Sequence, residues 1–198
     1  MSLVEAKGLE KHYGDDVVLE RLNFSVEPGE FVTIVGASGC GKTTFLKMML
    51  GTESITKGQL LVDDKPIPGE PGPDRGVVFQ RYSVFPHLTV LGNTIIAEEL
   101  SRSRVFGKLF GPGRRKAREA AMERLTQVGL QHALDKYPHE LSGGMQQRLA
   151  IAQALMMKPR ILLLDEPFGA LDPGIRQDMH ELVGKLWREQ KLTIFMIT

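Results

Sequence analysis

The strongest constraint on this chain is a glycine-rich segment at residues 36–43, Gly-Ala-Ser-Gly-Cys-Gly-Lys-Thr. It fits the pattern G-x-x-x-x-G-K-[ST], in which the glycines let backbone N–H groups turn inward around phosphate oxygens. The β-rich run at residues 30–35 before it indicates a buried strand, and residues 42–50 after it indicate a helix. Because a helix N-terminus carries partial positive charge, this order of elements predicts a phosphate-binding loop.

Two side chains of this loop have distinct expected roles. Lys42 is expected to reach the β- and γ-phosphate oxygens, and Thr43 to offer its hydroxyl to Mg²⁺. Cys40 has two open interpretations, a reactive thiol beside phosphate or a position that contributes only its backbone. The remaining expected nucleotide contacts are Gly36, Ala37, Ser38, Gly39, Gly41 and Thr44.

A pair of acids follows a second predicted strand. Residues 161–164 form a continuous apolar run, and Asp165 and Glu166 come directly after it. Ligands of open α/β sheets bind at the carboxyl ends of the strands. Asp165 therefore suits the Mg²⁺ shell, and Glu166 is predicted to polarise the attacking water as the catalytic base. Without the phosphate loop, two solvated acids at a strand end would explain the pair equally well.

The wider pattern predicts an α/β fold with a largely parallel sheet, with a third buried strand at residues 192–197. Residues 89–157 instead have helical periodicity, so we expect a helical lobe inserted into an α/β core formed by residues 1–88 and 158–198 of a single domain. The expected core stripes of this lobe are Ala121, Leu125 and Val128, and then Met145, Leu149, Ala152 and Met156.

Composition limits the partners of this chain. The net charge of +1 gives no strong overall attraction to nucleic acid, and the single cysteine permits no intrachain disulfide. No stretch approaches the roughly 18 to 20 apolar residues that span a bilayer, and the N-terminal residues show no secretory signal. We therefore expect any work at a membrane to require a partner subunit.

A second glycine motif lies at residues 141–148, Leu-Ser-Gly-Gly-Met-Gln-Gln-Arg. Ser142 is a favourable helix N-cap, and the two glycines leave the following N–H groups uncovered, which predicts a second anion site. One ATP has one γ-phosphate, which the phosphate loop already surrounds, so this second site is interpreted as serving a nucleotide held by another copy. The alternative is a capped helix after a glycine turn.

Together these motifs resemble the ABC ATPases along essentially the whole chain. In that family the LSGGQ-type signature of one subunit closes over ATP on the other in a head-to-tail dimer, and Met145 stands here where Gln is usual. The resemblance implies a P-loop NTPase (RecA-like) core, an inserted helical lobe and an N-terminal antiparallel β portion. It also implies that Ser142, Gly143 and Gly144 contact the partner's nucleotide.

The resemblance assigns three further residues. Tyr13 matches the aromatic residue that stacks on adenine, although it would also suit a surface turn. Gln80 matches the glutamine that contacts Mg²⁺ and the attacking water, and Asp172 lies in the loop that crosses to the partner's site. The family usually has Ser where Gly169 stands, a departure shared by many importers.

The segments 81–93 and 165–172 are similar to those of importer ATPases, closest to the nitrate, sulfonate and taurine group. This implies ATP and Mg²⁺ as cofactors, a peripheral position at the cytoplasmic face of the membrane, and no nucleic acid partner. The implied partners are a second ATPase subunit, integral membrane permease subunits and a periplasmic or extracellular solute-binding protein. Alternatives are a non-transport ABC ATPase acting on DNA or ribosomes, and a regulatory nucleotide-binding subunit.

Two other features lead to expectations. The chain ends at Thr198, where the family continues with a switch histidine and further elements, so we expect a C-terminally shortened chain that binds nucleotide and hydrolyses it weakly. Residues 101–118 hold seven basic residues and no acid, which fits contact with lipid head groups or an acidic loop of a membrane subunit, or a solvated loop and helix face.

Overall fold

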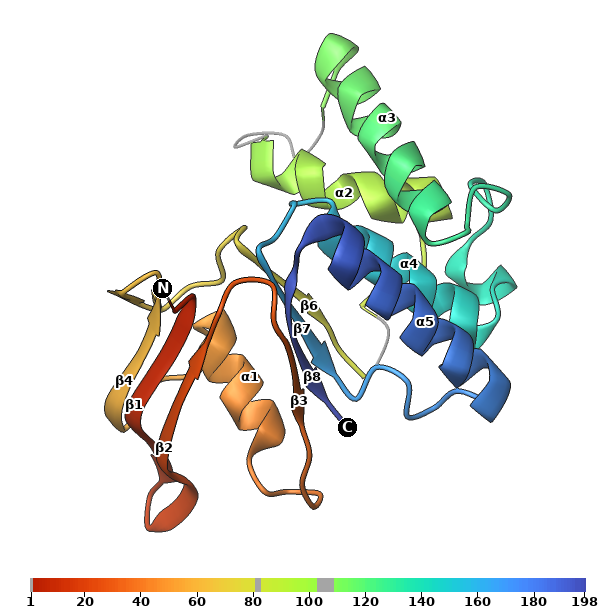
Figure 1. Cartoon of the computed structure of the whole chain (residues 1–198). Helices are drawn as coiled ribbons and strands as arrows, with labels where there is room; N and C mark the ends of the chain where they lie inside the picture. Colours follow the sequence, from red (N-terminus) through yellow and green to blue (C-terminus); the bar gives the residue numbers. More distant parts are fainter. Residues whose placement is uncertain (1, 81–82, 103–108) are drawn as a thin grey trace. The chain divides into compact units, whose positions relative to one another are not determined.

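The computed structural model describes residues 2–80, 83–102 and 109–198. The chain divides into two compact units (Figure 1). Unit 1 consists of residues 1–77, 160–166 and 187–198, and unit 2 consists of residues 78–159 and 167–186. Within the described ranges, no helix has the length and apolar character needed to cross a bilayer.

Unit 1 contains an antiparallel sheet near the N-terminus. Its strands are β1 (Val4–Tyr13), β2 (Asp16–Val26), β4 (Lys57–Val62) and β5 (Lys65–Pro66), in the order β2-β1-β4-β5. Buried residues of β1, among them Val4, Ala6 and Leu9, face the core. Strands β1 and β2 form a hairpin in which Tyr13 pairs with Asp16. This sheet is the antiparallel portion that the family resemblance implied.

The second sheet contains parallel strand pairs. Its strands are β3 (Phe31–Ile34), β6 (Arg75–Val78), β7 (Ile161–Asp165) and β8 (Thr193–Ile197), in the order β3-β8-β7-β6. Strands β7 and β8 are buried at every residue, which explains their continuous apolar sequences. Because β3 and β7 both run parallel to β8, their carboxyl ends meet at one edge of the sheet.

Helix α1 (Lys42–Leu50) lies between the two sheets of unit 1 (Figure 1). Its buried side chains join residues of both sheets in one hydrophobic core. The ring of Phe45 lies 5.7 Å from that of Phe24 on β2 and 6.1 Å from that of Phe195 on β8, measured between centroids. The helix ends at Gly51, whose φ of +81° favours glycine. The predicted order of strand, loop and helix across residues 30–50 is therefore confirmed.

Unit 2 is helical. It contains α2 (Val90–Arg102), α3 (Gly111–Gln127), the short 3₁₀ turn η1 (Pro138–Glu140), α4 (Gly143–Leu155) and residues 173–186 of α5 (Pro173–Gln190). Helices α2, α3 and α4 pack against one another. The predicted α3 stripe is fully buried, and in the α4 stripe Leu149 and Ala152 are fully buried while Met145 is half-buried. Residues 167–186, expected in the α/β core, group here with the helices.

One fully buried side chain, Asn93 on α2, organises the loop before that helix. Its Oδ1 atom accepts a hydrogen bond from the N–H of Phe85 at 2.7 Å. Its Nδ2 atom donates to the carbonyl oxygens of Phe85, Leu88 and Thr89 at 3.0, 2.9 and 3.1 Å. This loop belongs to the importer-like segment, of which Arg81 and Tyr82 lie outside the described residues.

We expect Asn93→Ala to lower the free energy of unfolding by about 2–3 kcal/mol, because it removes the partner of a loop amide and a set of loop carbonyls. Urea denaturation measures this change. The matched control is Thr94→Val, since the neighbouring buried Thr94 makes a single hydrogen bond to the Val90 carbonyl. Equal losses in the two variants would contradict the organising role of Asn93.

Candidate nucleotide site

The phosphate loop connects β3 to α1 in unit 1. Gly39 and Gly41 have φ values of +82° and +92°, which glycine adopts without a steric penalty. Gly41 is also the N-cap of α1, and no side chain in the described part of the protein caps this helix. The N–H groups of its first turn are therefore directed toward the loop and suit an anion.

Lys42 lies between the loop and the acidic strand end. Its Nζ atom donates to the carbonyl oxygens of Gly36 at 2.5 Å and Ala37 at 3.1 Å. The same atom is 4.0 Å from Oε1 of Glu166. Glu166 has a φ of +43°, and its N–H donates to the Ile197 carbonyl at 3.2 Å. Non-glycine residues with positive φ are uncommon and gather at functional sites.

Thr43 and Asp165 meet in the same region. The Thr43 hydroxyl donates to Oδ1 of Asp165 at 3.2 Å. Burial raises the pKa of Asp165; the hydrogen bond from Thr43 opposes this shift, and the nearby Glu166 charge adds to it. A hydroxyl and a carboxylate oxygen at this separation suit a hard cation such as Mg²⁺. Among the described residues, no group of three or more His, Cys, Asp and Glu lies close enough together to hold a metal ion.

Tyr13 lies at the end of β1, and 46% of its surface is exposed. Its hairpin is next to the phosphate loop, because a Cβ atom built on Gly41 would lie 2.8 Å from Cγ1 and 2.9 Å from the carbonyl oxygen of Val18 on β2. The ammonium group of Lys11 lies 4.6 Å from the centroid of the Tyr13 ring. Sequence reasoning missed Lys11, although side chains two residues apart in a strand share a face.

The other predicted site residues belong to unit 2. Ser142 is the N-cap of α4, as predicted, and its Oγ atom accepts a hydrogen bond from the Met145 N–H at 3.3 Å. A Cβ atom on Gly144 would lie 2.6 Å from Cγ2 of Ile175, so α4 and α5 approach closely where they begin. Asp172 directly precedes α5, and Gln80 lies two residues beyond the end of β6.

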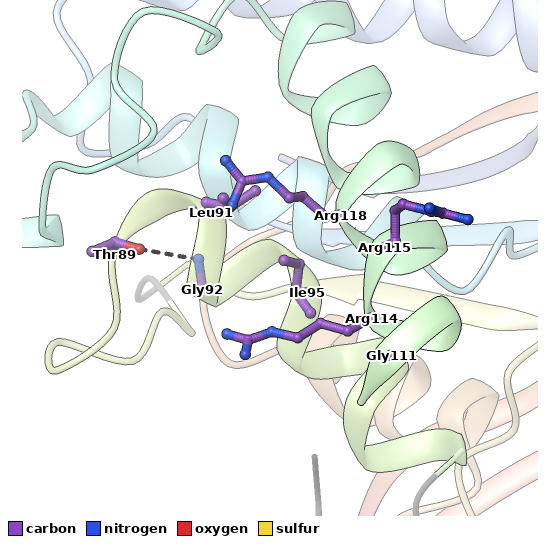
Figure 2. A pocket seen from close by; sticks show the side chains of 8 residues that line it. All are labelled: Thr89, Leu91, Gly92, Ile95, Gly111, Arg114, Arg115 and Arg118. Carbon is purple, nitrogen blue, oxygen red and sulfur yellow. Dashed lines mark hydrogen bonds between the residues drawn. The ribbon is translucent and has the colours of Figure 1, made fainter. Parts of the chain in front are cut away.

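Part of the basic segment lines a cavity of about 390 Å³ within unit 2 (Figure 2). Arg114 and Arg118 extend from α3 toward the start of α2, where Leu91 and Ile95 form an apolar wall. The first-turn N–H of Gly92 donates to Thr89 Oγ1 at 3.2 Å. Arg104 and Lys108 lie outside the described residues, and both interpretations of this segment stay predictions.

The family model, the similar sequences and the similar structures all point to the same family. A family model described as ABC transporter matches residues 19–169. The bicarbonate transport ATP-binding protein CmpD of Synechocystis is 43% identical over 93% of this chain, and the nitrate transport protein NasD of Klebsiella oxytoca is 41% identical over 99% of it. The dimeric post-hydrolysis structure of the ATP-binding cassette MJ0796, bound to ADP and Pi, matches 98% of this chain and 87% of that one at 31% identity and a TM-score of 0.80.

The chain spans 63% of the length of CmpD and 74% of the length of NasD. The family match covers most of the chain and includes the phosphate loop, the Ser142 motif and the acidic pair. By this match, and by the arrangement of Lys42, Thr43, Asp165 and Glu166 at one edge of a parallel sheet, the chain belongs to the ABC transporter family of ATP-binding domains.

Proposed function

We propose that this chain binds and hydrolyses ATP to power solute transport through a partner membrane permease. The observation that carries the proposal is the convergence of the phosphate loop with Asp165 and Glu166 in unit 1. In this proposal the loop amides and Lys42 hold the phosphates, and Tyr13 stacks on adenine.

The proposed chemistry is attack of water on the γ-phosphorus. Glu166 orients the water and accepts its proton. Thr43 and Asp165 would hold Mg²⁺ together with Gln80, and the ion would neutralise charge on the phosphate oxygens. Lys42 stabilises the developing negative charge of the transferred group.

A second copy completes each nucleotide site in this proposal. Ser142, Gly143 and Gly144 begin a helix that suits an anion, and Asp172 precedes the neighbouring helix. In a head-to-tail dimer these residues contact the nucleotide on the partner's phosphate loop. The dimeric structure of MJ0796 with ADP and Pi supports this assembly.

The names of the relatives support transport over the alternative of an ATPase acting on DNA or ribosomes. CmpD is a bicarbonate transport ATP-binding protein, and NasD is a nitrate transport protein. We place this chain as a peripheral subunit at the cytoplasmic face of the membrane, bound to integral permease subunits. A solute-binding protein outside the membrane would deliver the solute.

Mixing two inactive variants tests the two-copy site. Lys42→Ala removes the phosphate-binding lysine, and Ser142→Arg places a bulky side chain where the partner's nucleotide would bind. Each variant alone should be inactive. A one-to-one mixture should recover about a quarter of the wild-type ATPase rate, because half of the dimers are mixed and each contains one complete site.

The control mixture combines Lys42→Ala with Glu166→Gln. Here no site is complete, because the phosphate loop and Glu166 act in the same chain, so activity should stay absent. If the first mixture were as inactive as the second, the composite site would be wrong. ATP-dependent dimerisation is followed in parallel by sedimentation.

A further inference from the structure

Lys11 on β1 is a buried lysine of unit 1, with 4% of its surface exposed. Lysine is almost never this buried unless its charge has a partner. Here the Nζ atom lies 2.6 Å from Oε1 of Glu53 and donates to the Ser54 carbonyl at 2.8 Å. The ammonium group is therefore fixed at two points by the segment that follows α1.

The fixed ammonium group lies over one face of the Tyr13 ring, at 4.6 Å from its centroid. Hydrogen bonds from Lys11, and secondly from Tyr13, lower the pKa of Glu53. The Tyr13 ring is thus held at its face by Lys11, whose ammonium group is in turn held by Glu53. Nearly half of its surface stays exposed, which leaves the ring available for stacking.

The same segment is joined to β1 on both sides of Lys11. The Thr56 N–H donates to the Glu10 carbonyl at 3.0 Å, and the His12 N–H donates to Thr56 Oγ1 at 3.0 Å. Glu53 follows α1, the helix that begins at the phosphate loop. The phosphate loop and α1 are therefore continuous along the chain with the segment whose side chains surround Lys11.

From this geometry we propose that Lys11 and Glu53 are positioning residues, which hold the Tyr13 ring so that its free face meets the adenine of ATP. The inference rests on the proposed ATP-binding function. It assigns Lys11 and Glu53 no contact with nucleotide, because both act through Tyr13. The ammonium group adds a cation–π contact to the covered face and excludes other positions of the ring.

The test compares two ligands that share the phosphates and differ in the base. Lys11→Met should weaken MgATP binding about five-fold, the effect expected from losing a cation–π contact and ring order. Binding of inorganic tripolyphosphate with Mg²⁺ should stay unchanged, because the phosphate loop is intact. Glu53→Gln should also weaken MgATP binding, by a smaller factor than Lys11→Met, and should leave tripolyphosphate binding unchanged. Titration calorimetry measures both ligands.

A double-mutant cycle separates positioning from general structural support. Tyr13→Ala alone should weaken MgATP binding about ten-fold through lost stacking. In that background Lys11→Met should cause no further loss. Lys7→Met is the matched control, since the exposed Lys7 pairs with Glu5 on the same strand at 2.8 Å, and both affinities should stay at wild-type values.

Equal weakening of ATP and tripolyphosphate by Lys11→Met, or a full additional loss in the Tyr13→Ala background, would overturn the positioning role. Unchanged ATP affinity in Tyr13→Ala would instead overturn the proposed adenine contact, and the positioning role with it. Thermal unfolding is recorded for every variant. If Lys11→Met does not fold, Glu53→Gln decides the outcome by the same comparison.

Discussion

Replacing Glu166 with Gln is expected to lower the rate of ATP hydrolysis by about 100- to 10,000-fold, the usual effect of removing a general base. The amide has nearly the same shape and cannot accept the proton of the attacking water. MgATP affinity should change less than about three-fold, because the 4.0 Å contact between Lys42 and Glu166 is partly exposed and weak. Single-turnover assays with labelled ATP measure the rate.

Retained binding without hydrolysis should trap an ATP-bound dimer, which sedimentation detects. The control is Glu119→Gln, an exposed acid on α3, which should leave the rate unchanged. A Glu166→Gln variant that hydrolyses ATP as fast as the wild type would remove Glu166 from the proposed mechanism.

Asp165→Asn is expected to have opposite effects on activity and stability. The rate of hydrolysis should fall by about 100-fold or more, because an amide is a much weaker ligand for Mg²⁺ than a carboxylate. The free energy of unfolding without nucleotide should rise at neutral pH. Burial raises the pKa of Asp165 above its ordinary value of 3.8, so the folded state disfavours the charged form.

The pH dependence follows from the direction of this shift. The protonated carboxyl contributes stability that is fully present below pH 3.8 and is lost as pH rises through the raised pKa of the folded state. Asparagine stays neutral, so the advantage of the variant should be largest near pH 7.5 and shrink toward pH 4. Asp178→Asn on α5, an exposed acid, is the control for loss of one charge. Lower stability of Asp165→Asn at pH 7.5 would contradict the burial argument.

The sequence predicts those parts of the site whose conformation depends on residues that are close together along the chain. Residues 30–50 form strand, loop and helix because apolar runs, glycines and a helix start follow one another directly. Asp165 ends its strand, and Ser142 caps its helix, for the same reason. Each of these interpretations needs information from fewer than about 20 neighbouring residues.

The parts that sequence reasoning missed depend on contacts between distant segments. Lys11 and Glu53 are 42 positions apart, and the pairing of β1 with β4 brings their segments together. The close approach of Gly144 to Ile175 likewise depends on how two helices pack. Asn93 belongs to the importer-like segment 81–93, and its four hydrogen bonds to the preceding loop give this residue a structural role that the sequence does not reveal.

The path of the chain between its two units has a mechanical consequence. The chain passes from one unit to the other after residues 77, 159, 166 and 186. One passage lies three residues before Gln80, and another lies directly after Glu166, whose φ is +43°. Any rotation of one unit against the other must be absorbed by the torsion angles at these passages. The two residues proposed to handle the attacking water, Gln80 and Glu166, therefore lie at or within three residues of these passages.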